Sequence, residues 1–562
     1  MFSEMDFMLR ERFKNISVQQ LFERLDLPAQ TQHRLEDFNH AGSDIASWIE
    51  EECHGDFNMQ LALLRQFLPD LARWKASPAN RMALADSLRP QVERGIEAMV
   101  VQATAQDSVP RMGQRHDLQA ALTLLTWMPQ IYAGICRDFT CRILPARRTH
   151  SLRLASLQCA IECLGKVVLL SARCYLPAPA GTWRRLHTLF AIATKLEIVD
   201  LPGAGPGART ARDQYLLATL FAGAEPARLH GSNQQKLIEV LCACAPLADI
   251  QATTLSGSAL RVSLNQDLPP LTRSRVRYRG EPLAATMDSI EWRIDVEPIA
   301  KLLQAAEKSW PAGLPRNAQN VLLHLQRSWA NSRHRTGTRH ASSERCKLVT
   351  GVSHCCGYLN RISTGNITWR EFLARLRESR PLGVTPVPAN QVEDGLPDAG
   401  ESGSAEYQRL AQHAFSARIV DSNSRGARLR TESELPSHLF VGQLLYMIAE
   451  RGNRQLAFVR WISANSDSTS IGVEYIARDA TPVHVAFCAG RKKSPYLEGL
   501  LIPGRASRLR QQSLLLPTPF FATGSCVEIF RKARKGSPVR RLQLTNKVTT
   551  GRALGLFLFE QR

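Results

Sequence analysis

The stretch SARIVDSNSRGARLRT, residues 416–431, decides how the second half of the chain folds. Apolar and polar residues alternate at 416–420 and again at 427–431, which is typical of β-strands with one buried face. The hexamer between these runs extends from Asp421 to Gly426. Asp and Asn favour turns because their side chains bond to their own backbone, and Gly permits a positive φ. The sequence therefore predicts an antiparallel hairpin.

Short strand-like runs continue on both sides of this hairpin. They cover residues 347–352, 442–448, 455–462, 470–476, 483–487, 499–502, 526–531, 542–544 and 554–559. Parallel strands need long crossovers, usually helices, and these runs are too closely spaced for them. We expect an antiparallel β-barrel over 331–480, followed by a small basic β module over 481–562.

One segment inside the expected barrel has a different composition. Residues 380–408 are rich in Pro, Gly, Ser, Asp and Glu, and a short helix is expected just before them at 369–379. Such a composition buries too little apolar surface to offset the entropy lost on ordering. We therefore predict a disordered, acidic insertion.

The first half of the chain is predicted to be helical. Apolar residues recur at intervals of three and four within 61–71, 82–101, 118–135, 152–170 and 215–221, with Pro and Gly between the runs. We expect an all-helical domain over 1–250 and a mixed connector lobe over 251–330, which also contains alternating runs. The fold class is multi-domain α+β.

Charge and composition narrow the class of protein. Lys+Arg 71 against Asp+Glu 51 leaves a net charge of +20, which favours anionic partners such as nucleotides, nucleic acid or anionic membranes. The most apolar stretch, 154–176, contains three charges, so we expect a buried helix and no transmembrane segment. No signal-peptide pattern opens the chain, and the 13 cysteines lack a disulfide framework, so we expect a cytoplasmic protein.

Enzyme and metal motifs are missing from the sequence. It contains no P-loop, no H-E-x-x-H and no G-x-S-x-G. His354, Cys355 and Cys356 lie together, but no second ligand pair at zinc spacing accompanies them. We predict that the chain is not an enzyme and holds no metal or cofactor.

The order of several short motifs points to a ligand. Arg335 and Arg339 form an R-x-x-x-R ahead of the first strands, and the hairpin hexamer follows as D-x-N-x-x-G. A strand with the sequence G-V-E-Y closes the series at 472–475. An R-x-x-x-R alone carries no information in so basic a chain, so the argument depends on the order.

This order resembles the PilZ domain, a small β-barrel receptor for cyclic di-GMP with the signatures R-x-x-x-R and (D/N)-x-S-x-x-G. The resemblance covers about 331–480 and implies a site made of Arg335, Arg339, Asp421, Asn423 and Gly426. It implies a receptor for cyclic di-GMP that passes its signal to a protein partner, often in motility, adhesion or biofilm control. The segments 88–90 and 181–187 also look like the N-terminal region of some large proteobacterial PilZ proteins.

The residue types suit such a ligand. An arginine can bond guanine O6 and N7, clamp a phosphate or stack over a base. Asp421 can accept hydrogen bonds from the guanine N1–H and N2–H₂ edge, and Gly426 leaves room beside the base. Asn423 stands where the family usually has Ser. Trp461 and Tyr475 are expected in the barrel core.

Two other functions remain open at this point. The basic β module at the C-terminus would suit a nucleic-acid-binding protein, because residues 531–562 contain nine Lys/Arg and one Glu. The departure at Asn423 would suit a structural adaptor whose barrel has lost its ligand.

Overall fold

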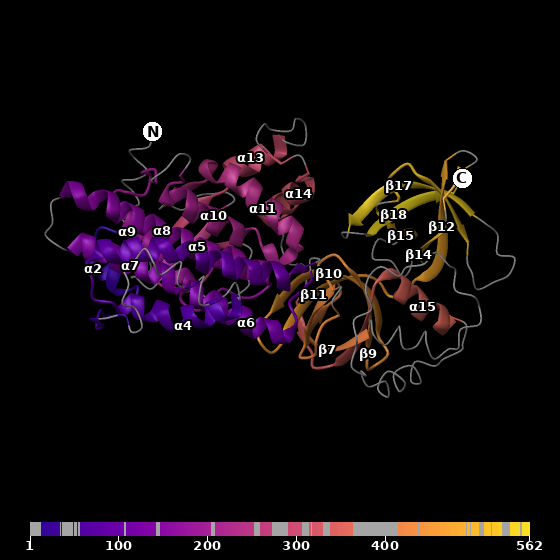
Figure 1. Cartoon of the computed structure of the whole chain (residues 1–562). Coiled ribbons are helices and arrows are strands. Elements are labelled where there is room, and N and C mark those ends of the chain that lie inside the picture. The colour runs from indigo at the N-terminus through magenta and orange to yellow at the C-terminus, as the bar shows by residue number, and fades with distance from the viewer. Residues whose placement is uncertain are drawn as a thin grey trace. The chain divides into compact units, whose positions relative to one another are not determined.

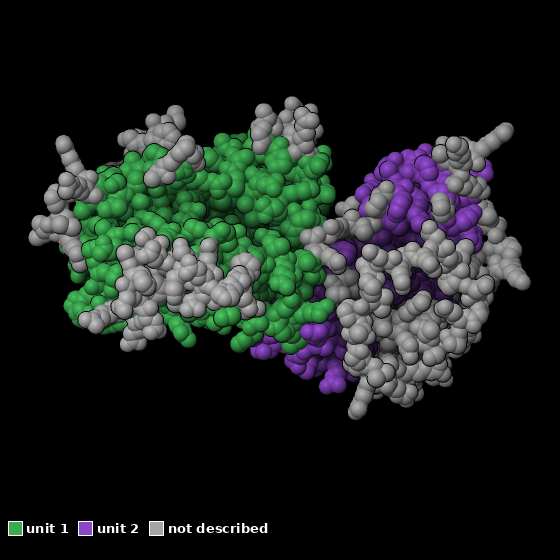
Figure 2. Space-filling model, in the orientation of Figure 1, with its two compact units in different colours: residues 1–336 green, residues 337–562 purple. Residues whose placement is uncertain are grey.

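A computed structural model describes the chain as two compact units, residues 1–336 and 337–562 (Figure 2, green and purple). The description leaves out residues 1–12, 34, 36–48, 50–52, 54–56, 106–107, 142–145, 204–207, 252–258, 273–289, 306–313, 316, 330–337, 364–413, 437–438, 490–491, 495, 505–510, 519, 531–539, 551–553 and 562. The expected insertion at 380–408, the helix expected at 369–379 and Arg335 therefore lie outside the described residues.

Helices build most of the first unit (Figure 1, indigo to magenta). They are α2 (Val18–Glu23), α4 (Phe57–Arg73), α5 (Pro78–Ala103), α6 (Met112–Leu125), α7 (Trp127–Cys141), α8 (Ala146–Arg173), α9 (Thr182–Lys195), α10 (Ala211–Gly223) and α11 (Gly231–Cys244), with short 3₁₀ turns at Pro226–Arg228 and Ala245–Leu247. The predicted helical half is confirmed. The helix expected over 118–135 is two helices, which part at Thr126.

Helix α8 forms the centre of this unit, where it packs against α7, α9 and α10. Its segment Thr149–Arg173 is long and apolar enough to cross a membrane, but 67% of the apolar window is buried inside the protein. Its apolar residues are therefore already covered by neighbouring helices, as is typical of a core helix.

Residues after α11 add a small antiparallel sheet and two helices to the same unit. The sheet has the order β1-β4-β2-β3, from β1 (Asp249–Gln251), β2 (Ala259–Ser263), β3 (Leu271–Thr272) and β4 (Glu291–Asp295), and the helices are α13 (Glu297–Ala305) and α14 (Gln319–Trp329). Trp292 on β4 is fully buried, with its ring 5.8 Å from those of Phe13 and His187. Asp267 accepts hydrogen bonds from the backbone N–H groups of Gly181 and Arg184 at the start of α9. The segment expected as a connector lobe thus contributes to the core of the helical unit.

The second unit begins with a closed antiparallel barrel (Figure 1, orange). Its strands are β6 (Arg345–Thr350), β7 (Ala414–Asn423), β8 (Gly426–Thr431), β9 (Leu444–Ala449), β10 (Arg454–Ala464) and β11 (Thr469–Ala477), and the short β5 (His340–Ala341) pairs with the end of β7. Pairing of β7 with β8 closes the ring of six strands. The predicted hairpin and antiparallel barrel are both confirmed.

A second six-stranded barrel follows, and it has the same strand order as the first (Figure 1, yellow). It consists of β12 (Thr481–Ala489), β14 (Leu497–Ile502), β15 (Ser513–Pro517), β16 (Cys526–Phe530), β17 (Arg540–Thr550) and β18 (Leu554–Gln561), with β13 (Lys492–Lys493) at the edge of β12. Counted along the chain, the strands of each barrel follow one another around the ring in the order 1-2-3-6-5-4. The region expected as a small β module is therefore a PilZ-like barrel as well.

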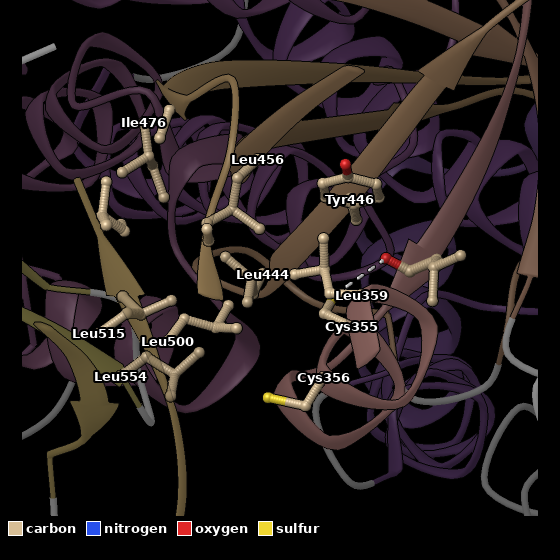
Figure 3. Packing of buried hydrophobic residues seen from close by; sticks show 14 of the residues in the cluster. Cys355, Cys356, Leu359, Leu444, Tyr446, Leu456, Ile476, Leu500, Leu515 and Leu554 are labelled. Atoms are coloured by element: carbon tan, nitrogen blue, oxygen red, sulfur yellow. Dashed lines mark hydrogen bonds between the residues drawn. The ribbon is translucent and has the colours of Figure 1, made fainter. Parts of the chain in front are cut away.

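Helix α15 (Val352–Ser363) joins the two barrels through one hydrophobic core (Figure 3). Cys355, Cys356 and Leu359 are buried there beside Leu444 of the first barrel and Leu500 of the second. The Cys356 thiol donates to the carbonyl oxygen of a β14 residue at 3.6 Å, and burial raises the pKa of both cysteine thiols. The sequence analysis predicted a strand ending at 352 and assigned no element to 353–363, so it missed this helix. Its two cysteines serve packing.

Candidate functional site

Four of the five predicted site residues lie together at one end of the first barrel. Arg339 directly precedes β5, Asp421 and Asn423 end β7, and Gly426 begins β8. Pairing of β5 with β7 places the arginine segment beside the hairpin, because Ala341 is opposite Asp421. Arg335, the fifth, is outside the described residues.

Asp421 lies between two arginines. The Arg339 guanidinium donates to Asp421 Oδ1, and Arg428 Nε donates to Asp421 Oδ2 at 2.9 Å. Arg339 and Asp421 are 82 residues apart in the sequence, and their side chains are 22% and 17% exposed. The two motifs that the sequence places far apart thus meet through a charge-assisted hydrogen bond.

Asn423 stabilises the turn and keeps its amide NH₂ group for other contacts. Its Oδ1 accepts from the backbone N–H of Arg425 at 2.9 Å and of Gly426 at 3.1 Å. Two backbone donors require the oxygen at this position, so the Asn423 nitrogen is the atom that faces away from the turn. A serine hydroxyl could accept from the same backbone groups, so the departure from the family pattern preserves the turn.

Gly426 is required by the close approach of two strands. It lies opposite Glu474 of β11, and a Cβ atom here would be 2.1 Å from the backbone oxygen of Val473. The backbone N–H of Tyr475 donates to the carbonyl of Arg425 at 2.8 Å, which continues the contact around the turn. Any side chain at Gly426 would therefore move the hairpin away from β11.

The register of the barrel adds Arg428, which the sequence did not indicate, and Trp461, which was expected in the core. Asp421 is opposite Arg428, Arg428 is opposite Gly472, and Gly472 is opposite Trp461. Opposite residues of an antiparallel pair share one face, so these four form a row across β7, β8, β11 and β10. We call them the aspartate row.

Trp461 is half-buried in this row, on the outer face of the barrel. Its ring lies over Gly472, where a Cβ atom would be 1.9 Å from the indole nitrogen. A bulge between Val459 and Trp461 shifts the register of β10. The expectation that Trp461 belongs to the barrel core is therefore wrong: a flat aromatic surface lies in the same row as Asp421 and Arg428.

Tyr475 is also half-buried, at the side of the site near Arg339. Burial raises the pKa of its hydroxyl to about 12, while the positive charge of Arg339 lowers it. The expectation that Tyr475 lies in the core is thus met only in part.

The described site combines three kinds of contact group. Arg339 and Arg428 are cationic donors, Asp421 is an acceptor, and Trp461 offers an aromatic face. Among the described residues, no group of three or more His, Cys, Asp or Glu side chains could hold a metal ion. These groups can bind a molecule that is anionic, carries hydrogen-bond donors and has flat rings.

Comparison with known proteins identifies related domains in both units. The family description "Cyclic-di-GMP receptor FimW, N-terminal domain" matches residues 43–254, and "Cyclic-di-GMP receptor FimW, middle PilZ domain" matches residues 378–482. The cyclic-di-GMP receptor FimW of Pseudomonas aeruginosa is 24% identical over 564 residues, which cover 90% of this chain and 88% of that protein. No solved structure matches the chain.

The matched PilZ range contains the hairpin, the aspartate row and the G-V-E-Y strand, and the matched N-terminal range falls on the helical unit. The chain therefore contains a PilZ domain and a helical N-terminal domain of the FimW type.

Proposed function

We propose that the chain is a cytoplasmic cyclic di-GMP receptor that binds its ligand on the outer face of the first barrel, at the β7–β8 hairpin. The observation that supports this most directly is the bond between Arg339 and Asp421, which joins the two halves of the PilZ signature across 82 residues. The similarity to a cyclic-di-GMP receptor over 90% of the chain supports the same ligand.

Binding exchanges one set of partners for another. Without ligand, the Asp421 carboxylate is neutralised by Arg339 and Arg428. A guanine edge brings N1–H and N2–H₂ donors to Asp421, and the phosphates or guanine O6 and N7 bring acceptors to the two arginines. The Asn423 amide donates from the turn, and Trp461 stacks on a guanine ring. Asp421 and the two arginines thus keep partners in both states, which limits the desolvation penalty.

Arg335 would complete the grip on the ligand from the other side. The boundary between the two units falls at 336–337, between the two arginines of the motif. A ligand that orders the segment 335–339 would therefore restrict the connection between the units, and its differential affinity would supply the switching energy. Output through a protein partner, with a role in motility, adhesion or biofilm control, belongs to this proposal.

Calorimetric titration with cyclic di-GMP tests the proposal. Arg339→Ala and Asp421→Ala should each weaken binding by roughly ten- to a hundred-fold, because a bidentate base contact is worth about 1–3 kcal/mol. Arg261→Ala is the matched control: it removes an ion pair to Glu291 of similar exposure, 25% and 19%, in the other unit. It should leave affinity unchanged. Wild-type protein that gives no heat at tens of micromolar ligand would refute the receptor function.

The same preparation tests the proposed switch. Hydrogen exchange over 331–345 should slow when ligand is added, and this protection should be lost in Asp421→Ala. Ligand binding without any change in exchange there would retain the receptor and refute the switch.

A further inference from the structure

A second row of outward-facing residues crosses the first barrel next to the aspartate row. Arg345 of β6 is opposite Arg418 of β7, and Arg418 is opposite Arg430 of β8. All three side chains are exposed. Directly opposed residues share one face with Cβ atoms about 4.5–5.5 Å apart, so the three arginine side chains leave the barrel from adjacent points. We call them the arginine row.

No carboxylate of the described chain forms an ion pair with the arginine row. Other arginines of the same barrel do have such partners: Arg428 binds Asp421, and Arg460 binds Glu474. Like charges directly opposite one another destabilise a sheet. The arginine row therefore weakens the isolated barrel, and an anionic partner would relieve the repulsion.

The surroundings of the row indicate which anion fits. Beyond Arg430 the row continues to Ser470 of β11 and Ser463 of β10. At its other end Glu450, which follows β9, lies opposite Arg345 and donates its backbone N–H to the Arg345 carbonyl at 3.0 Å, so the positive charge is confined to three strands. The exposed large apolar side chains of the described second unit are at Tyr496, Phe520 and Val548, outside the first barrel. The row itself therefore holds no aromatic platform for bases and no apolar anchor for a bilayer, and the aromatic face of Trp461 belongs to the aspartate row.

The identity of the cations also favours carboxylates. All three are arginine, whose rigid fork bonds a carboxylate through two parallel hydrogen bonds. Same-face side chains of an extended strand recur about every 6.6–6.8 Å, and adjacent strands of a sheet lie about 4.7–4.9 Å apart. The reach of an arginine side chain covers this difference, so a strand lying across β6–β8 can present one carboxylate to each arginine.

We propose that the arginine row docks an acidic segment of a partner protein, with Asp or Glu at alternate positions of an extended strand. The row is separate from the groups that hold Asp421, since Arg430 is two residues beyond Arg428 and Arg345 is on a strand outside the aspartate row. Partner docking and nucleotide binding therefore depend on different side chains of one face.

Fluorescence anisotropy tests the docking surface with a labelled 12-residue peptide of alternating Glu and Ser and the full-length protein. The triple variant Arg345→Ser, Arg418→Ser, Arg430→Ser should weaken peptide binding roughly tenfold or more. The control triple variant Arg209→Ser, Arg478→Ser, Arg540→Ser removes the same charge from exposed positions off the row and should bind like wild type. The row variant should also keep its affinity for cyclic di-GMP and unfold at an unchanged or higher temperature.

Several results would overturn the docking surface. Absence of saturable peptide binding by wild type would do so, as would equal losses in the two triple variants, because net charge alone would then explain binding. Row-dependent binding of phosphatidylglycerol vesicles or of a dT12 oligonucleotide, without row-dependent peptide binding, would assign the row to a membrane or nucleic acid. A tenfold loss of cyclic di-GMP affinity in the row variant would assign it to the nucleotide site. Failure of wild type to bind cyclic di-GMP, with row-dependent peptide binding intact, would refute only the nucleotide proposal.

Discussion

Gly426→Ala tests whether the hairpin must lie directly against β11. The new Cβ would be 2.1 Å from the Val473 backbone oxygen, and ordinary contact begins at about 3.4 Å, so the strands must separate by more than 1 Å. Neither backbone can give way as a flexible side chain would. Such overpacking costs typically about 1–3 kcal/mol. For a unit of this size, that lowers Tm by roughly 2–12 °C.

Differential scanning calorimetry of the full chain should show this loss in the transition of the second unit. Cyclic di-GMP affinity should fall by at least about tenfold, because a displaced hairpin moves Asp421 away from Arg339. Gly113→Ala is the control, since no atom lies within 4 Å of its added Cβ. It should leave nucleotide binding unchanged. An unchanged Tm and affinity in Gly426→Ala would show that Gly426 does not lie against Val473, which would refute the register on which the site depends.

Four further changes probe the site and the two cores. Trp461→Ala should weaken cyclic di-GMP binding by roughly 5–100-fold, as expected for loss of a stacked base, while Trp461→Phe retains most of the affinity in calorimetry. Asn423→Ser should bind like wild type, whereas Asn423→Ala loses the turn acceptor and should bind more weakly. An affinity of Asn423→Ala equal to that of wild type would show that the turn does not need this side chain. Burial lowers the pKa of His187 to about 4, although the hydrogen bond to the Leu268 carbonyl and the negative charge of Asp267 each raise it. The unfolded chain then binds a proton that the folded one does not, so the first unit should lose roughly 2–4 kcal/mol as pH falls from about 6.5 to about 4. His187→Gln should flatten that part of the urea-unfolding profile, and an unchanged slope would contradict a neutral buried imidazole. Leu359→Ala should destabilise both barrels together by about 2–5 kcal/mol, and separate melting of the two barrels would contradict their shared core.

Local patterns were enough to predict the general organisation of the chain. Alternation of apolar and polar residues predicted the β7–β8 hairpin and the barrel, and helical spacing predicted the first half. These signals are local, because side-chain periodicity depends only on the geometry of each element. Helix α15 was not predicted. Its apolar residues Cys355, Cys356 and Leu359 pack against two barrels, and the sequence does not show that these barrels lie together.

The motif residues of the candidate site were predictable from the sequence, but their contacts were not. The motif order identified Arg339, Asp421, Asn423 and Gly426 without a structure, because each stands in a recognisable short pattern. The contacts of Arg339 and Arg428 with Asp421 depend on which strands are neighbours in the barrel. No pattern within one strand specifies a neighbour, because closure of the barrel makes that choice.

The sequence alone determined that this chain has a helical half, antiparallel strands and a PilZ-type hairpin, since periodicity and turn chemistry act over a few residues. Only the tertiary structure decided what lies on each face of the barrel. The bulge before Trp461 and the pairing of β6, β7 and β8 bring the indole into the aspartate row and place three arginines side by side. Both results follow from register, because shifting a strand by one residue moves every side chain to the opposite face.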